Sequence, residues 1–227
     1  MALSPMMQHY VATKEEYKDC ILFYRLGDFY EMFFEDAKTV SEELELTLTG
    51  KDCGLDERAP MCGIPYHAAE VYIGRLIEKG YKVAICEQVE DPKQAKGIVK
   101  REVIRVVTPG TTMNSQGLDE ARNNYIMSVV CIDERFGVSA ADISTGECLV
   151  TELDKESKLL DEISKFMPSE IICNQTFLVC GIDCEDLKTR LHICVNALED
   201  WYFDDSKCEQ VLKEHFKTLS LEGLGLM

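Results

Sequence analysis

A short segment rich in aromatic and acidic residues, Phe23 to Asp36, has the clearest chemical pattern in this chain. Gly27 and Asp28 interrupt its apolar run with a turn signal, at a point where an exposed ring can be presented. An aromatic wedge between base steps kinks a duplex, at least cost where pairing is already defective. The carboxylate of Glu31 repels phosphates, but it can accept a hydrogen bond from a base amino group. The segment therefore predicts a reader of defective base pairs.

The same residues are similar to the Phe-x-Glu mismatch-recognition motif of the MutS family. The resemblance implies that Phe29 is the wedge and Glu31 the base contact, and that the ligand is double-stranded DNA containing mispairs or small loops. It covers the whole chain and is strongest in the first half. Further segments match the family in order along the chain: Pro5–Gln8, Met61–His67, Val83–Gln88, Asp91–Pro92, Arg105–Thr111 and Asn123–Gly146.

The formal net charge of −17 argues against DNA binding by general electrostatics, which depends on Lys and Arg. The charge is unevenly distributed, because residues 1–112 hold 14 basic and 19 acidic side chains and residues 113–227 hold 10 and 22. One basic cluster in the first half is the candidate for phosphate contacts, with a solvated loop as the alternative. It consists of Lys93, Lys96, Lys100, Arg101 and Arg105.

Composition predicts a cytoplasmic globular protein with no membrane partner, because no apolar run is long enough to span a bilayer and the start lacks the regions of a signal peptide. The 11 cysteines are interpreted as reduced thiols, since their number is odd and no Cys-x-x-Cys pair occurs. The alternative is a zinc site formed by Cys180, Cys184, His192 and Cys194. The spacing of these four residues matches no common zinc pattern, so no metal ligand is predicted.

The chain is predicted to be α/β with two domains. Residues 1–112 are expected to form a small mixed-sheet mismatch-binding domain and residues 113–124 a linker. Residues 125–227 begin with three strand-like runs and continue with alternating helices and strands, which resembles the ribonuclease H fold and the MutS connector domain. The expected strands of this part are Tyr125–Ile132, Phe136–Ile143, Glu147–Leu153 and Glu170–Cys173, and a last helix within Asp204–Leu219 has the apolar stripe Val211, Leu212, Phe216 and Leu219. Phe33, Ala37, Val40 and Leu44 predict the apolar stripe of a helix that follows Phe29. The Lys51–Pro60 segment is expected to be a loop, and Gly63-Ile64-Pro65 to lead into a helix.

Three rival functions follow from the same sequence. A nuclease is possible for a ribonuclease H-like fold, but Asp133 and Asp142 are more typical of a turn and a strand end than of a two-metal site. A Cys-His hydrolase has no residue marked as an activated nucleophile. The main alternative is a protein–protein interaction module with an acidic connector and no intrinsic DNA discrimination. Arg25 is expected to pair with Asp28 or Asp36. Tyr66 and His67 follow Gly-Ile-Pro as in the family pattern, and two roles stay open for them: a place near the DNA backbone, or helix capping and packing.

The chain contains no Gly-x-x-x-x-Gly-Lys-Ser/Thr phosphate loop, so no enzymatic activity, catalytic residue or cofactor is predicted for it. The resemblance implies a fragment from the N-terminal part of a longer protein. A DNA-dependent ATPase that uses ATP and Mg²⁺, together with most dimer contacts, is then expected in the remainder of that protein. The acidic connector is expected to meet the other domains and a downstream repair protein.

Overall fold

The computed structural model describes residues 3–90, 99–112 and 123–226. The chain forms two compact units, Met1–Arg122 and Asn123–Met227. Of the predicted linker, residues 113–122 lie outside the described part, as do the candidate phosphate contacts Lys93 and Lys96.

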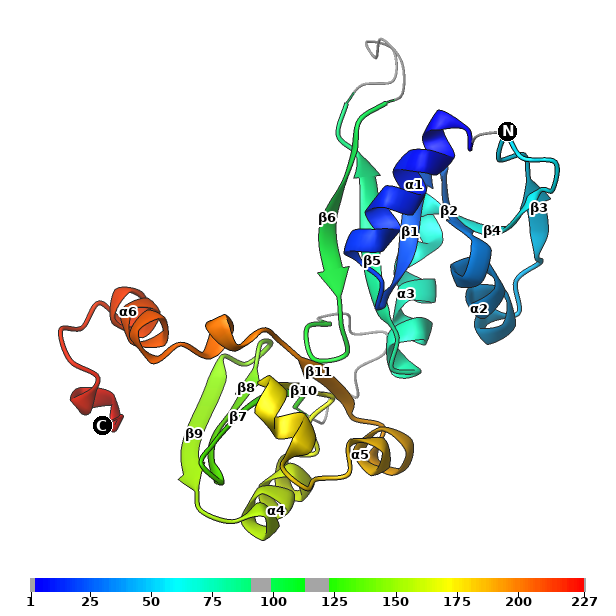
Figure 1. Ribbon diagram of the computed structural model, residues 1–227. Helices are drawn as coiled ribbons and strands as arrows, with labels where there is room; N and C mark the ends of the chain where they lie inside the picture. Colours follow the sequence, from blue (N-terminus) through cyan, green and yellow to red (C-terminus); the bar gives the residue numbers. More distant parts are fainter. Residues whose placement is uncertain (1–2, 91–98, 113–122, 227) are drawn as a thin grey trace. The chain divides into compact units, whose positions relative to one another are not determined.

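The first unit is built on a six-stranded mixed sheet with the order β3-β4-β2-β1-β5-β6 (Figure 1). Only the β1–β5 pair is parallel, and each other neighbouring pair is antiparallel. The central strands are therefore joined both by a hairpin and by a crossover that carries helices. The strands are β1 (Cys20–Leu26), β2 (Phe29–Phe33), β3 (Thr49–Lys51), β4 (Ala59–Pro65), β5 (Lys82–Gln88) and β6 (Arg101–Val107).

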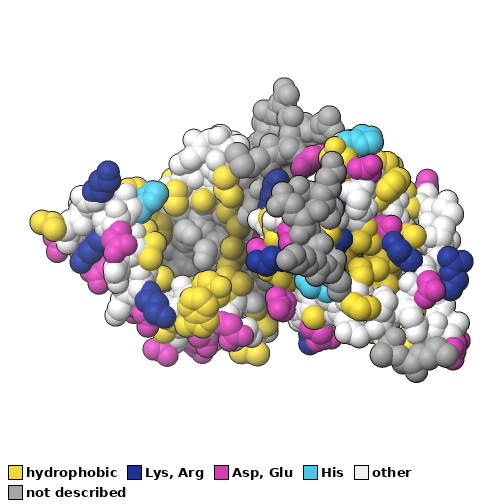
Figure 2. Space-filling model, turned by 90° about the horizontal axis from the view of Figure 1, so that it is seen from above, with side chains coloured by type: hydrophobic (Ala, Val, Ile, Leu, Met, Phe, Trp, Pro, Cys, Tyr) yellow, Lys and Arg dark blue, Asp and Glu magenta, His cyan; other side chains and the backbone are white. Residues whose placement is uncertain are grey.

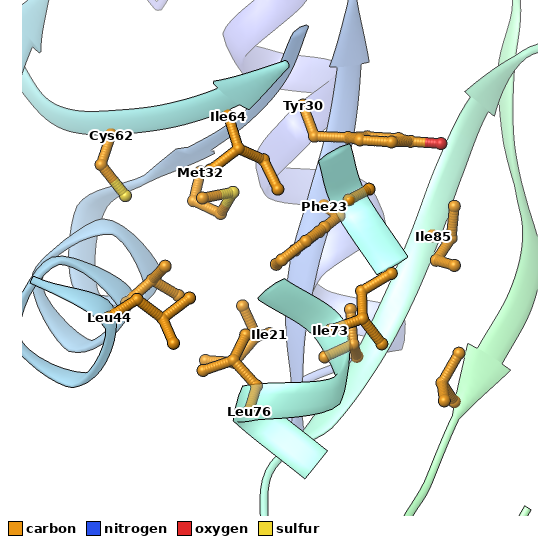
Figure 3. Packing of buried hydrophobic residues seen from close by; sticks show 14 of the residues in the cluster. Ile21, Phe23, Tyr30, Met32, Leu44, Cys62, Ile64, Ile73, Leu76 and Ile85 are labelled. Atoms are coloured by element: carbon orange, nitrogen blue, oxygen red, sulfur yellow. The ribbon is translucent and has the colours of Figure 1, made fainter. Parts of the chain in front are cut away.

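Helices cover both faces of this sheet, so the central strands are buried on both sides. Alternate residues of β1 enter two cores: Phe23 packs with α2 (Phe34–Leu44) and α3 (Ala69–Glu78), whereas Tyr24 packs with α1 (Pro5–Glu16). Figure 3 shows Phe23 in the first core beside Tyr30 and Ile73. These two cores hold β1 and β2 from either side. A short 3-10 helix, η1 (Tyr66–Ala68), joins β4 to α3.

One expectation for this unit was wrong in detail, and one strand was missed. Phe33 is the last residue of β2 rather than part of α2, and its ring lies in the α1 core. Gly63-Ile64-Pro65 leads into a helix as expected, but these residues themselves form the end of β4, a strand that was not predicted and that lies between β3 and β2. The predicted loop at Lys51–Pro60 accordingly lies between two paired strands.

The second unit has a five-stranded sheet with the order β11-β10-β7-β8-β9. The first three strands form an antiparallel meander, and β10 and β11 then add in parallel beside β7. This arrangement agrees with the predicted ribonuclease H-like connector. The elements are β7 (Tyr125–Ile132), β8 (Arg135–Asp142), β9 (Glu147–Leu153), α4 (Glu156–Phe166), β10 (Glu170–Cys173), η2 (Gln175–Val179), α5 (Cys184–Leu191), β11 (Cys194–Ala197), η3 (Asp200–Phe203), α6 (Asp205–Phe216) and η4 (Glu222–Leu224).

The second unit contains the residues that were considered for a nuclease site and for a zinc site. Asp133 lies in the β7–β8 turn and Asp142 ends β8, as expected for structural acids. Asp142 is buried and accepts hydrogen bonds from Ser144 and from the Asn124 and Thr145 amides. Among the described residues, no three His, Cys, Asp or Glu side chains are arranged to hold a metal ion. All 11 cysteines are free thiols. No helix in the described ranges is long and apolar enough to cross a membrane.

Candidate nucleic-acid interface

Phe29 lies at the tip of the β1–β2 hairpin. Leu26 pairs with Phe29, which leaves Gly27 and Asp28 as a two-residue turn. Gly27 has φ +60°, as the first central residue of a tight hairpin turn often requires. The Asp28 carbonyl also accepts a hydrogen bond of 2.9 Å from the Tyr66 amide, which ties the turn to η1. The ring at residue 29 is therefore carried by a firmly connected hairpin.

The Phe29 ring differs from the other rings of its segment because it is exposed. Its exposed fraction is 47%, against 6% for Tyr30, 1% for Phe33 and 0% for Phe23. The adjacent Phe34 is half-buried and has a left-handed backbone, with φ +53°, where β2 changes into α2. The segment therefore uses most of its rings as core and presents one ring to solvent.

A charged and aromatic network lies at the base of the hairpin. The Arg25 guanidinium donates to the Glu87 carboxylate at 3.1 Å and stacks 3.8 Å from the centroid of the Tyr66 ring. The Tyr30 hydroxyl donates to the same carboxylate. Burial, and then the hydrogen bond to Glu87, raise the pKa of Tyr30, so this hydroxyl keeps its proton. These contacts connect β1, β2, β5 and η1 around the hairpin.

The expected ion pair of Arg25 with Asp28 or Asp36 was wrong. Asp36 is buried in the first unit, where it lies 2.9 Å from the Lys14 ammonium and accepts a hydrogen bond from the Leu22 amide. The partner of Arg25 is Glu87, which is close only because β1 and β5 are adjacent strands.

Glu31 lies two residues after Phe29 on the same strand, so both side chains leave the same face of the sheet. This is the face covered by α1, because Phe33, two residues further on, packs in the α1 core. The Glu31 carboxylate is largely shielded and forms an ion pair with Lys51 of β3. Gly63 is the residue of β4 opposite Glu31, and it is exposed. The candidate base contact therefore lies beside the Phe29 ring, at the edge of the α1 core.

The three described residues of the basic cluster differ in their exposure and in their partners. Arg105 is exposed on β6, and Lys100 is exposed but pairs with Glu102, which raises the pKa of the lysine. Arg101 is buried, and its guanidinium donates to the carbonyls of Arg25 and Val99. Basic side chains are scattered among acidic ones on the face shown in Figure 2. Of these three, Lys100 and Arg105 are exposed and Arg101 is buried, and the phosphate contacts stay a prediction.

Sequence reasoning did not identify Lys51 and left the role of Tyr66 open between packing and DNA contact. Lys51 is the last residue of a three-residue edge strand, whereas it was expected to begin a loop, so its reach to Glu31 had no sequence signal. Tyr66 is 45% exposed and stacks on Arg25. The sequence signal available for Tyr66 was the Gly63-Ile64-Pro65 segment directly before it, which matches the family pattern.

Comparison with known proteins gives the same family for both units. The family model described as MutS domain I matches residues 4–116, and MutS domain II matches residues 124–227. The chain is 68% identical over 224 residues to a "DNA mismatch repair protein MutS" of Lachnoclostridium phytofermentans, covering 99% of this chain and 24% of the relative. It is 54% identical to the proteins of that name from Acetivibrio thermocellus, over 97% of the chain and 26% of the relative, and Clostridium tetani, over 100% and 25%. The chain spans about a quarter of the length of these curated relatives. It belongs to the MutS family of DNA mismatch repair proteins.

Proposed function

We propose that this chain recognises mispaired or looped double-stranded DNA in mismatch repair. In this proposal the Phe29 ring enters the duplex at the defective step and the Glu31 carboxylate accepts a hydrogen bond from the displaced base. Unstacking a base step costs least where pairing is already weak, so the cost of the kink provides the discrimination. Arg105, Lys100 and the basic residues before them would fix the register on the phosphates.

The observation that carries the proposal is the contrast between Phe29 and its neighbours. Core rings of this segment are almost fully buried, whereas Phe29 is 47% exposed at the end of a tight hairpin. A half-exposed phenyl ring gains less free energy from burial in the free protein than a core ring, and a rigid hairpin lowers the entropy lost when the ring is inserted. The acidic partner on the same strand face adds a contact that reads a base rather than the backbone.

The test is equilibrium binding of the chain to a labelled duplex with one mispair and to its matched control, at low and moderate salt. Phe29→Ala is expected to lose the preference for the mispair while binding of the matched duplex changes little. Phe216→Ala on α6 is the control, since it removes another half-exposed ring, in the second unit. Loss of preference in Phe29→Ala alone supports the wedge.

Equal binding of both duplexes by the unaltered chain and by Phe29→Ala would contradict the proposal. The interaction-module alternative would then become the leading hypothesis, with the acidic second unit as its contact surface. The ATPase, its ATP and Mg²⁺, dimerisation and contact with a downstream repair protein are proposed for the longer family protein. The binding assay needs none of them.

A further inference from the structure

The Lys51–Glu31 ion pair joins two strands that are not neighbours in the sheet. Lys51 belongs to β3, which is separated from β2 by β4, so the lysine crosses a whole strand to reach Glu31. Its ammonium passes 5.7 Å from the centroid of the Phe33 ring on the way. A side chain that extends across a strand and over an aromatic face is fixed in direction by packing as well as by charge.

The strand that Lys51 crosses has no side chain at the position facing Glu31. Gly63 is the cross-strand partner of Glu31, and a Cβ built on it would lie 3.4 Å from Glu31 Cγ and 3.3 Å from the Tyr30 carbonyl oxygen. Any larger residue would crowd the base of the glutamate side chain. The glycine therefore leaves space beside the base of the Glu31 side chain.

The position of Glu31 relative to Phe29 matters for binding. Residues two apart on a strand have Cα atoms separated by about 7 Å, so the two side chains start close together on one face of β2. An unpaired carboxylate at this distance would be repelled by the phosphates and free to rotate. With Lys51 attached, its charge is offset and its spare oxygen lone pairs keep a defined direction.

Resting on the proposed mismatch recognition, we propose that Lys51 is a positioning residue for Glu31, fixing the direction of its carboxylate through their ion pair so that it can accept a hydrogen bond from a displaced base. Lys51 need not touch DNA for this role. Its contribution should appear in discrimination between duplexes and should depend on Glu31 being present.

The test measures the ratio of affinities for mispaired and matched duplex in the 227-residue chain. Lys51→Met keeps the length of the side chain and removes its charge, and it is expected to lower the ratio about three- to tenfold, as for a weakened hydrogen bond to a charged group. Lys51→Arg restores the charge and should recover most of the ratio. Lys79→Met is the control, because it removes an equal charge and an ion pair, with Glu43, elsewhere in the first unit. Urea unfolding of each variant verifies the fold.

A double variant separates positioning from a structural role. In a Glu31→Gln background, Lys51→Met should change the ratio by less than about twofold, because the group that it positions is already altered. The inference is overturned if Lys51→Met leaves the ratio unchanged, or lowers it equally with and without Glu31. If the unaltered chain shows no mispair preference, or if Phe29→Ala retains it, the proposed function itself fails, and the inference fails with it. The two failures are therefore distinguishable.

Discussion

The Arg25 guanidinium lies 3.8 Å from the centroid of the Tyr66 ring, so β1 and η1 meet directly beneath the hairpin that carries Phe29. The same guanidinium pairs with Glu87 of β5. A planar cation can stack on a ring and donate to a carboxylate at once, which an ammonium group does less well. The orientation of the hairpin that carries Phe29 is therefore supported by Arg25, which lies at its base.

Arg25→Lys is expected to lower both the free energy of unfolding, by about 1 kcal/mol, and the preference for mispaired duplex. The physical reason is loss of the stacked, bridging geometry while the charge is kept. Urea unfolding followed by circular dichroism and the duplex-binding ratio are the measurements. Arg75→Lys, at an exposed position of α3, should change neither value by more than experimental error. Unchanged discrimination in Arg25→Lys would show that the network is dispensable for the wedge.

Gly27→Ala tests the hairpin turn itself. An added Cβ at residue 27 meets nothing within 4 Å, so its cost is backbone strain at φ +60° and not a clash, about 1 kcal/mol. Gly74→Ala in α3 is the matched control: its Cβ also has open space, but the helical backbone should gain roughly 0.5–1 kcal/mol. Opposite signs in urea unfolding are the expected result. Equal signs would contradict the turn geometry.

Local sequence patterns predicted most of the regular elements, because they depend on residues close together in the chain. The strand expected at Glu170–Cys173 and those at Tyr125–Ile132 and Glu147–Leu153 have the predicted bounds. Alternation and turn residues are local signals, and the tertiary structure agrees with them here. The two α/β units and the exposed Phe29 ring follow from the same kind of pattern.

The elements and contacts that were missed depend on tertiary context. Strand β4 contains Pro60, Gly63 and Pro65, which favour a loop in isolation, yet it pairs on both sides. The left-handed Phe34 lets a strand pass directly into a helix, and no propensity predicts that backbone for an aromatic residue. The partners of Arg25 and Glu31 follow from strand order rather than from sequence spacing. The apolar stripe predicted on α6 is genuine in sequence but has no buried residue.

Asp142→Asn is expected to lower the free energy of unfolding of the second unit, by an amount that depends on pH. The hydrogen bond from the Ser144 hydroxyl, with further bonds from the amides of Ser144, Thr145 and Asn124, holds the pKa of the Asp142 carboxyl below its usual range. A lowered folded-state pKa means that the stabilisation is complete above the unfolded value of about 3.9 and is lost as pH falls through the folded value.

The urea midpoint of Asp142→Asn should thus lie below that of the unaltered chain at pH 7. The difference between the two midpoints should begin to shrink as the pH falls below about 4. Asp161→Asn, at an exposed position of α4, serves as the control and should change the free energy of unfolding by less than about 0.5 kcal/mol. A difference that stays constant down to pH 2.5 would show that the carboxylate charge is not the stabilising group.

Arg105 and Arg101 should behave differently although they lie on one strand. Arg105 is exposed, so Arg105→Gln is expected to weaken binding of mispaired and matched duplex alike and to reduce the slope of log affinity against log salt by about 1. Arg101 is buried and donates to two carbonyls, so Arg101→Gln should lower the free energy of unfolding by about 1–3 kcal/mol. Salt titrations of binding and urea unfolding measure the two effects. A full salt slope in Arg105→Gln would exclude a phosphate contact at residue 105, and an undiminished stability in Arg101→Gln would show that water replaces its buried hydrogen bonds.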